Sequence, residues 1–208
     1  MILEADVTLT DLALAAECAA FAVILLRRGG TVSRLCALVF VALGASSLLG
    51  ALWHGMFSAG DTAAGRYVWF GTMACLALAA TATLHLAAAL VPDGPWPRRI
   101  RTWAKVQLVG QLVVSAGVTD AFAVGALGLV PASVLLAVIC ARVYARSGNC
   151  RALCGAGGLV LAVLAGLVIV ADISVPPNLS AIALYHLVQA VAFWMVFLSV
   201  PALASQPK

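Results

Sequence analysis

The sequence predicts an all-α integral membrane protein, built as a bundle of seven transmembrane helices. Its 208 residues are 64% hydrophobic and only 10% charged, with a mean hydropathy of +1.10. A soluble domain has roughly 45–50% apolar and about 25% charged residues, so this chain has too few polar groups to enclose an ordinary core. The apolar residues come in blocks of about 16–25, which suits helical spans rather than the alternating ten-residue strands of membrane barrels.

Charged and turn-forming residues mark where each apolar block begins and ends. The fourth and fifth blocks need a break, because Val106–Ala141 as a single helix would be about 54 Å long. The hydrocarbon core is only ~30 Å thick, so we place a tight reversal at Gly117–Asp120, where Asp120 can cap the next helix. The seven expected spans are Asp11–Leu26, Leu35–Phe57, Tyr67–Val91, Ile100–Val118, Phe122–Val143, Leu153–Ala171 and Leu179–Val200.

The basic residues predict the orientation of these spans. Every Lys and Arg except Arg66 follows the first, third or fifth span or lies at the C-terminus. Because positive charge is retained on the cytoplasmic side, we expect the N-terminus outside and the C-terminus in the cytoplasm of a multi-pass protein of the plasma (inner) membrane. The segment Met1–Asp11 is acidic and lacks the basic start of a secretory leader, so the first span is expected to be retained.

The whole chain, residues 1–208, is expected to form one membrane domain. Its 12 Lys and Arg against 8 Asp and Glu make it only mildly basic, and the basic residues are explained by topology, so nucleic acid is not an expected partner.

Ionisable side chains within a span are costly and therefore mark candidate sites. At ~1.5 Å per residue, His54 lies about 5 Å and His186 about 10 Å below the outer boundary, with Glu17 about 9 Å deep. Asp120 and Asp172 are expected at the same outer rim, whereas His85 is expected near the opposite face.

These positions favour a metal site, with zinc as the ion. His54 and His186 would be neutral imidazole ligands, and Asp120 or Glu17 would serve as carboxylate ligand or general base. Ser47, seven residues before His54, shares its helix face and is a further catalytic candidate. Alternatively, the same residues form a buried polar network that only fixes helix register, or the two histidines are the axial pair of a b-type haem.

Three segments resemble an uncharacterised family of bacterial seven-span proteins: Thr8–Asp11, Gly50–Phe57 and Leu184–Gln189. More remotely, a histidine near the end of the second span and another at the start of the seventh resemble the superfamily of alkaline ceramidases and adiponectin-receptor-type proteins. This resemblance implies a seven-span, zinc-dependent hydrolase of lipid amides or esters, with the metal on the N-terminal side of the membrane.

The sequence departs from that superfamily at the third histidine. Ile182 and Ala190 stand four residues before and after His186, and Gly50 stands where the superfamily has serine, four residues before His54. The alternative to a hydrolase is therefore a non-catalytic accessory or assembly subunit of a larger membrane complex. The expected partners are membrane lipids and either other membrane subunits or a second copy of the chain.

Overall fold

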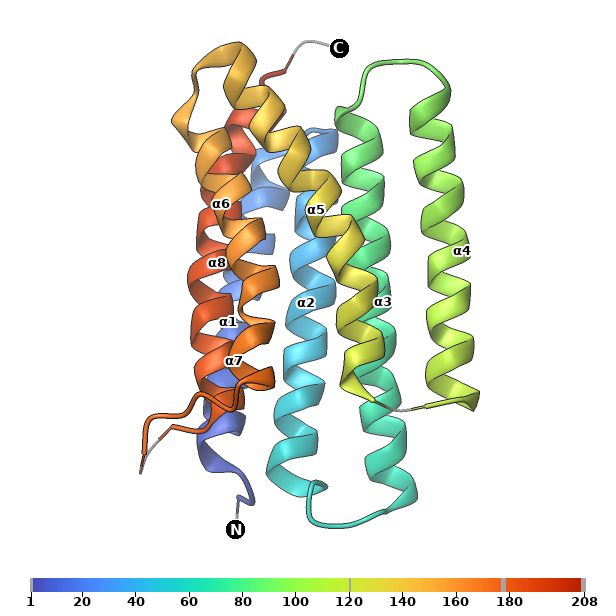
Figure 1. Cartoon of the computed structure of the whole chain (residues 1–208), viewed down its shortest axis with the longest axis vertical. Helices are drawn as coiled ribbons and strands as arrows, with labels where there is room; N and C mark the ends of the chain where they lie inside the picture. The colour runs from blue at the N-terminus through green and yellow to red at the C-terminus, as the bar shows by residue number, and fades with distance from the viewer. Residues whose placement is uncertain (1, 120, 177–178, 207–208) are drawn as a thin grey trace.

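The computed structural model describes residues 2–119, 121–176 and 179–206, and over these residues the chain is helical with no strand. The helices run up and down in a bundle (Figure 1). Their bounds are α1 Ala5–Arg28, α2 Thr31–Met56, α3 Ala63–Leu90, α4 Pro95–Gly117, α5 Phe122–Ser147, α6 Cys150–Leu164, α7 Gly166–Val170 and α8 Ala181–Ala204.

Six helical stretches are long and apolar enough to cross a membrane, so the chain is a multi-pass membrane protein. They are α1, α2, α3, α5, the stretch α6–α7, and α8. The expected fourth span corresponds to α4, which is not among the six. Its first half carries Arg98, Arg99, Arg101 and Lys105, and these charges lower its hydropathy.

Several helices extend beyond the spans expected from hydropathy. Helix α1 begins at Ala5 rather than Asp11, and α5 continues to Ser147 rather than ending at Val143. A helix does not stop where the hydrocarbon stops, because its backbone hydrogen bonds remain favourable in the interface, so hydropathy underestimates its length. The expected sixth span is divided at Ala165 into α6 and α7.

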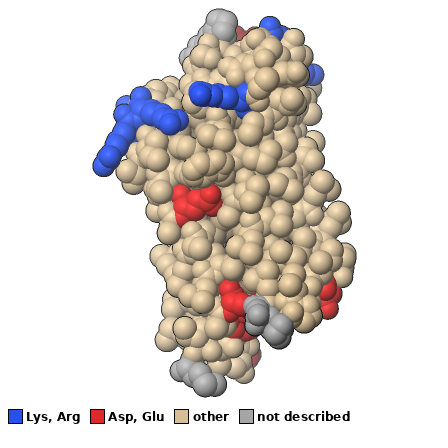
Figure 2. All heavy atoms as spheres, turned by 90° about the vertical axis from the view of Figure 1, so that its left-hand side faces the viewer, with Lys and Arg blue, Asp and Glu red and all other residues tan. Residues whose placement is uncertain are grey.

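The bundle has two chemically different ends. Figure 1 places the N-terminus at the end where α1 begins, which also holds the C-terminal end of α2 and the N-terminal end of α8. We call this the histidine end, because His54 and His186 lie there. We call the opposite end, with the α1–α2, α3–α4 and α5–α6 connections, the basic end. On the face shown in Figure 2, the Lys and Arg side chains lie at one end and most of the Asp and Glu side chains lie toward the other.

Close helix packing holds α1, α6 and α8 together. The buried residues of α1 include a stripe at alternating spacings of four and three: Val7, Asp11, Leu14, Cys18, Phe21 and Leu25. The Phe21 ring stacks on Phe197 of α8, with ring centroids 4.3 Å apart. On α6, a Cβ at Gly158 would lie 2.7 Å from the Ala192 carbonyl oxygen of α8, so glycine is what lets these two helices approach.

Helix α4 lies at the edge of the bundle, next to α3 (Figure 1). Its link to α5 is polar, because the Gln111 side-chain amide donates to the backbone carbonyls of Val124 (3.0 Å) and Gly125 (3.3 Å). Helix α5 also contains Pro131, six residues after Gly125, and the backbone nitrogen of proline cannot donate a helical hydrogen bond.

Candidate functional site

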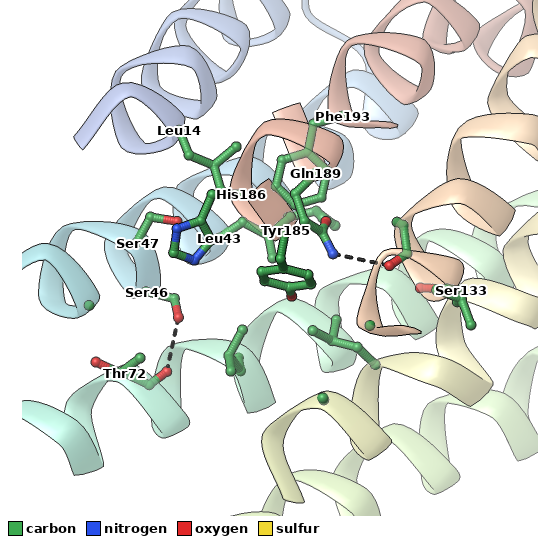
Figure 3. Close-up of a pocket in the computed structure, with 18 of the residues that line it drawn as sticks. Leu14, Leu43, Ser46, Ser47, Thr72, Ser133, Tyr185, His186, Gln189 and Phe193 are labelled. Carbon is green, nitrogen blue, oxygen red and sulfur yellow. Dashed lines mark hydrogen bonds between the residues drawn. The ribbon is translucent and has the colours of Figure 1, made fainter. Parts of the chain in front are cut away.

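A cavity of about 400 Å³ opens inside the bundle and reaches the histidine end. Among the described residues, every helix except α4 contributes to its wall, which is mostly apolar. Figure 3 shows Ser46 and Ser47 entering it from α2, and Tyr185, His186 and Gln189 from α8. Its polar lining residues are Asp11, Ser46, Ser47, His54, Thr72, Thr83, Ser133, Tyr185, His186 and Gln189.

Asp11 and His186 form a buried pair between α1 and α8. The two residues are 4% and 9% exposed, and His186 Nε2 lies 3.5 Å from Asp11 Oδ1. The other ring nitrogen, Nδ1, lies 3.2 Å from the Thr10 hydroxyl oxygen. The first and last helices of the chain therefore meet through both nitrogens of one imidazole.

The neighbours of Thr10 constrain where the protons of this pair lie. The Thr10 hydroxyl is 2.9 Å from the Asp6 carbonyl oxygen and 3.0 Å from that of Val7. When it donates to either of them, its oxygen accepts from His186 Nδ1–H, and Nε2 then faces Asp11. A proton on Asp11 or on Nε2 would make this 3.5 Å contact attractive, whereas two unprotonated groups would repel each other.

His54 reaches the same cavity from α2 and has a partner of its own. Its Nδ1 lies 2.7 Å from Glu4 Oε2, which makes Nδ1 the donor and leaves Nε2 with a free lone pair in the neutral ring. The His54 ring is edge-on to Trp53, with centroids 5.0 Å apart. The Glu4 side chain is 39% exposed, so this branch of the site extends toward water.

Gly50 makes room for the carboxylate of Asp11. A Cβ at position 50 would lie 2.8 Å from Asp11 Oδ2, which is closer than real Cβ contacts come. Four residues earlier, the Ser46 hydroxyl donates to the Thr72 carbonyl oxygen at 3.2 Å and ties α2 to α3 beside the cavity.

The structure places the expected site residues in three different ways. His54, His186 and Ser47 line the one cavity. Glu17 is not among the described residues that line it, because position 17 lies beside the buried stripe of α1 rather than on it. Asp120, expected as ligand and base, lies outside the described residues, and His85 lies near the basic end of α3.

Asp11 and Glu4 are the site residues that the sequence analysis missed. Asp11 had a signal in the sequence, since it is the acidic residue on the otherwise apolar stripe of α1. Glu4 precedes the first helix, and nothing in its local sequence points to His54, fifty residues further along the chain.

The described donors do not form a complete metal site. Both histidines carry a hydrogen-bond partner on Nδ1, as metal-binding imidazoles commonly do. However, no group of three or more His, Cys, Asp or Glu side chains among the described residues could hold a metal ion.

Comparison with known proteins gives a family but no activity. Residues 7–205 match the model of DUF6962, a family of unknown function. No curated protein and no solved structure matches the chain.

Proposed function

The chain belongs to DUF6962, a family of unknown function, and we propose that it is a membrane hydrolase of a lipid amide or ester. The observation that carries this proposal is the lining of the central cavity, where two imidazoles and a buried carboxylate adjoin a mostly apolar wall. Such a wall suits an acyl chain, and the polar end suits the carbonyl group attached to it.

In this proposal His54 is the general base. Its Nε2 accepts a proton from water as the water oxygen attacks the substrate carbonyl carbon. The proton bound by Asp11 and His186 is donated to the developing oxyanion. His54 then returns its proton to the leaving nitrogen or oxygen as the C–N or C–O bond breaks, and the re-forming carbonyl gives its borrowed proton back to the Asp11–His186 pair. The products are a fatty acid and an amine or alcohol, and Ser47 orients the water.

The experiment uses the purified full chain in nanodiscs with a long-chain N-acyl amide and the matching ester. Released fatty acid is measured for wild type, His54→Gln, His186→Gln and His85→Gln. The first two variants are expected to lose about 10²–10⁴-fold in turnover, while His85→Gln, away from the cavity, keeps it. No release by wild type, or full activity in His54→Gln, would refute the proposal.

The same preparation tests the expectation of zinc, and of haem. Stoichiometric zinc that is lost in His54→Ala would overturn the metal-free step above and favour the metal hydrolase that the resemblance implies. A haem absorption band lost in the same variant would replace both by cofactor binding.

We also propose that α4 is a seventh crossing and that the N-terminus lies outside the plasma membrane. Helices α3 and α5 both run from the histidine end to the basic end, so the chain between them has to return, and α4 is the helix that runs back. At ~1.5 Å per residue, its 23 residues reach about 35 Å.

The orientation is tested by cysteine labelling. With Cys75 and Cys154 replaced, a membrane-impermeant maleimide should label the exposed Cys150 only in inverted vesicles. Labelling in intact cells would reverse the proposed orientation.

A second function, a non-catalytic accessory or assembly subunit, is favoured by Glu17. This half-buried side chain of α1 has one carboxylate oxygen, Oε2, buried without a hydrogen-bond partner among the described residues. An ionisable side chain in a membrane is costly, and the part of Glu17 that stays accessible could meet a donor from another subunit or a second copy. Glu17→Leu should then reduce the mass of the complex extracted in mild detergent; a wild-type monomer with catalytic turnover would exclude this function.

A further inference from the structure

A second cavity, of about 720 Å³, lies at the basic end and is separate from the site described above. The α1–α2 and α3–α4 connections and the final turns of α5 and α8 surround it. Its wall has an apolar part, formed by the buried side chains of Ile139, Val143 and Leu203, and a polar rim.

Four arginines dominate the rim. Arg98 and Arg101 lie about one turn apart on α4, and Arg142 and Arg146 lie about one turn apart on α5. All four are exposed. Residues of one helix that are three or four positions apart share a face, so each helix presents a pair of guanidinium groups to the same cavity.

These charges lack protein partners in the part of the chain that the structure describes. Its ion pairs join His54 to Glu4, Arg66 to Asp61 and His186 to Asp11, and none of the four arginines has a carboxylate oxygen within 4.0 Å. Asp93 lines the same cavity but is not paired with them. Orientation in the membrane requires positive charge at this end, but it does not require four arginines around one cavity.

We propose that this cavity binds the phosphate headgroup of an anionic membrane lipid. Guanidinium groups present paired N–H donors that match phosphate oxygens, and basic pockets between helices at a membrane surface are sites where such headgroups bind. Thr31 and Ser33 also line the cavity, and a hydroxyl group is a neutral donor. The apolar wall next to the arginines accepts the first carbons of the acyl chains, which selects a phospholipid over free phosphate.

The test measures binding of a short-chain phosphatidic acid to the full chain in a neutral detergent at ~0.15 M salt, where distant charges are screened. The variant Arg142→Gln/Arg146→Gln removes two rim charges. The matched control Arg34→Gln/Arg151→Gln removes two exposed charges at the same end that do not line the cavity. Unfolding midpoints establish that both variants are folded.

We expect the affinity of the rim variant to fall by at least about tenfold, the loss that follows from even one charge-assisted hydrogen bond, and that of the control to stay near wild type. An equal fall in both variants would mean general surface attraction and would overturn the proposal, as would no fall in either. Inorganic phosphate and short-chain phosphatidylcholine complete the experiment. Displacement of the lipid by phosphate at equal concentration would assign the site to free phosphate. Equally tight binding of phosphatidylcholine would show that the anionic headgroup does not decide binding, and would overturn the proposal.

Discussion

At the histidine end the principal polar side chains are buried and paired within the protein, whereas at the basic end the arginines are exposed and have no carboxylate partner among the described residues. Asp11 and His186 are 4% and 9% exposed and contact each other across the first and last helices. Arg142 and Arg146 are exposed around an open cavity. Burying a polar group is costly unless it has a partner, so changes at the histidine end should affect folding, while changes at the basic end should affect binding and orientation.

The largest expected effect separates the two ends directly. His186→Ala leaves the buried Asp11 carboxyl without its partner and removes the volume of the ring, so the free energy of unfolding should fall by about 3 kcal/mol. Arg146→Ala should change it by less than about 0.5 kcal/mol. Denaturant titration in detergent measures both, and equal losses would contradict the comparison.

A smaller effect is expected from Gly50→Ala. The new Cβ would lie 2.8 Å from Asp11 Oδ2, so the carboxylate has to move and its contact with His186 is lost. A decrease of about 1–2 kcal/mol in the free energy of unfolding is expected. Gly110→Ala on α4 is the control, because no atom lies within 4 Å of its added Cβ; it should leave stability unchanged or raise it by up to about 1 kcal/mol. A neutral Gly50→Ala would argue against a tightly fitted carboxylate.

Glu4→Gln tests the half-exposed branch of the histidine end. The side-chain oxygen of glutamine can still accept from His54 Nδ1, and Glu4 is 39% exposed, so stability should fall by no more than about 1 kcal/mol. A thermal scan in detergent measures this change. A loss as large as that of His186→Ala would show that exposure does not decide the effect.

The smallest effect is expected for Asp61→Asn, which breaks the pair with Arg66 at the same end of the bundle. The two side chains are 77% and 65% exposed, and exposed ion pairs contribute about 0–1 kcal/mol. The unfolding midpoint should therefore hardly move. A clear drop would mean that position in the bundle, rather than burial, sets the difference between the two ends.

The apolar blocks predicted seven spans, and six helices among the described residues are long and apolar enough to cross a membrane. A run of some twenty apolar residues has few alternatives to a helix in lipid. The blocks also predicted that His54 and His186 belong to the same end of the bundle. The depth argument needs only the direction of each helix, and His54 and His186 do line one cavity in the structure.

The partners of those histidines could not be predicted in the same way. Asp11 was interpreted as the start of a span, because a charged residue next to an apolar block usually marks a boundary. Its role depends on α1 packing against α8, a contact between residues 175 positions apart that local hydropathy does not encode. Glu17 shows the reverse, because depth alone does not tell which side of its helix a residue takes: it lies beside the buried stripe of α1 and is not among the described residues that line the cavity.

Gln189 has a consequence for the backbone of α6. Its side-chain amide donates to the backbone carbonyl of Ala162 at 3.0 Å, three residues before the division between α6 and α7 (Figure 3). A backbone carbonyl without a donor is poorly tolerated in hydrocarbon. Without this amide, as in a Gln189→Leu protein, the carbonyl loses that donor at the place where α6 gives way to α7. One side chain of the last helix thus secures the backbone beside the helix break.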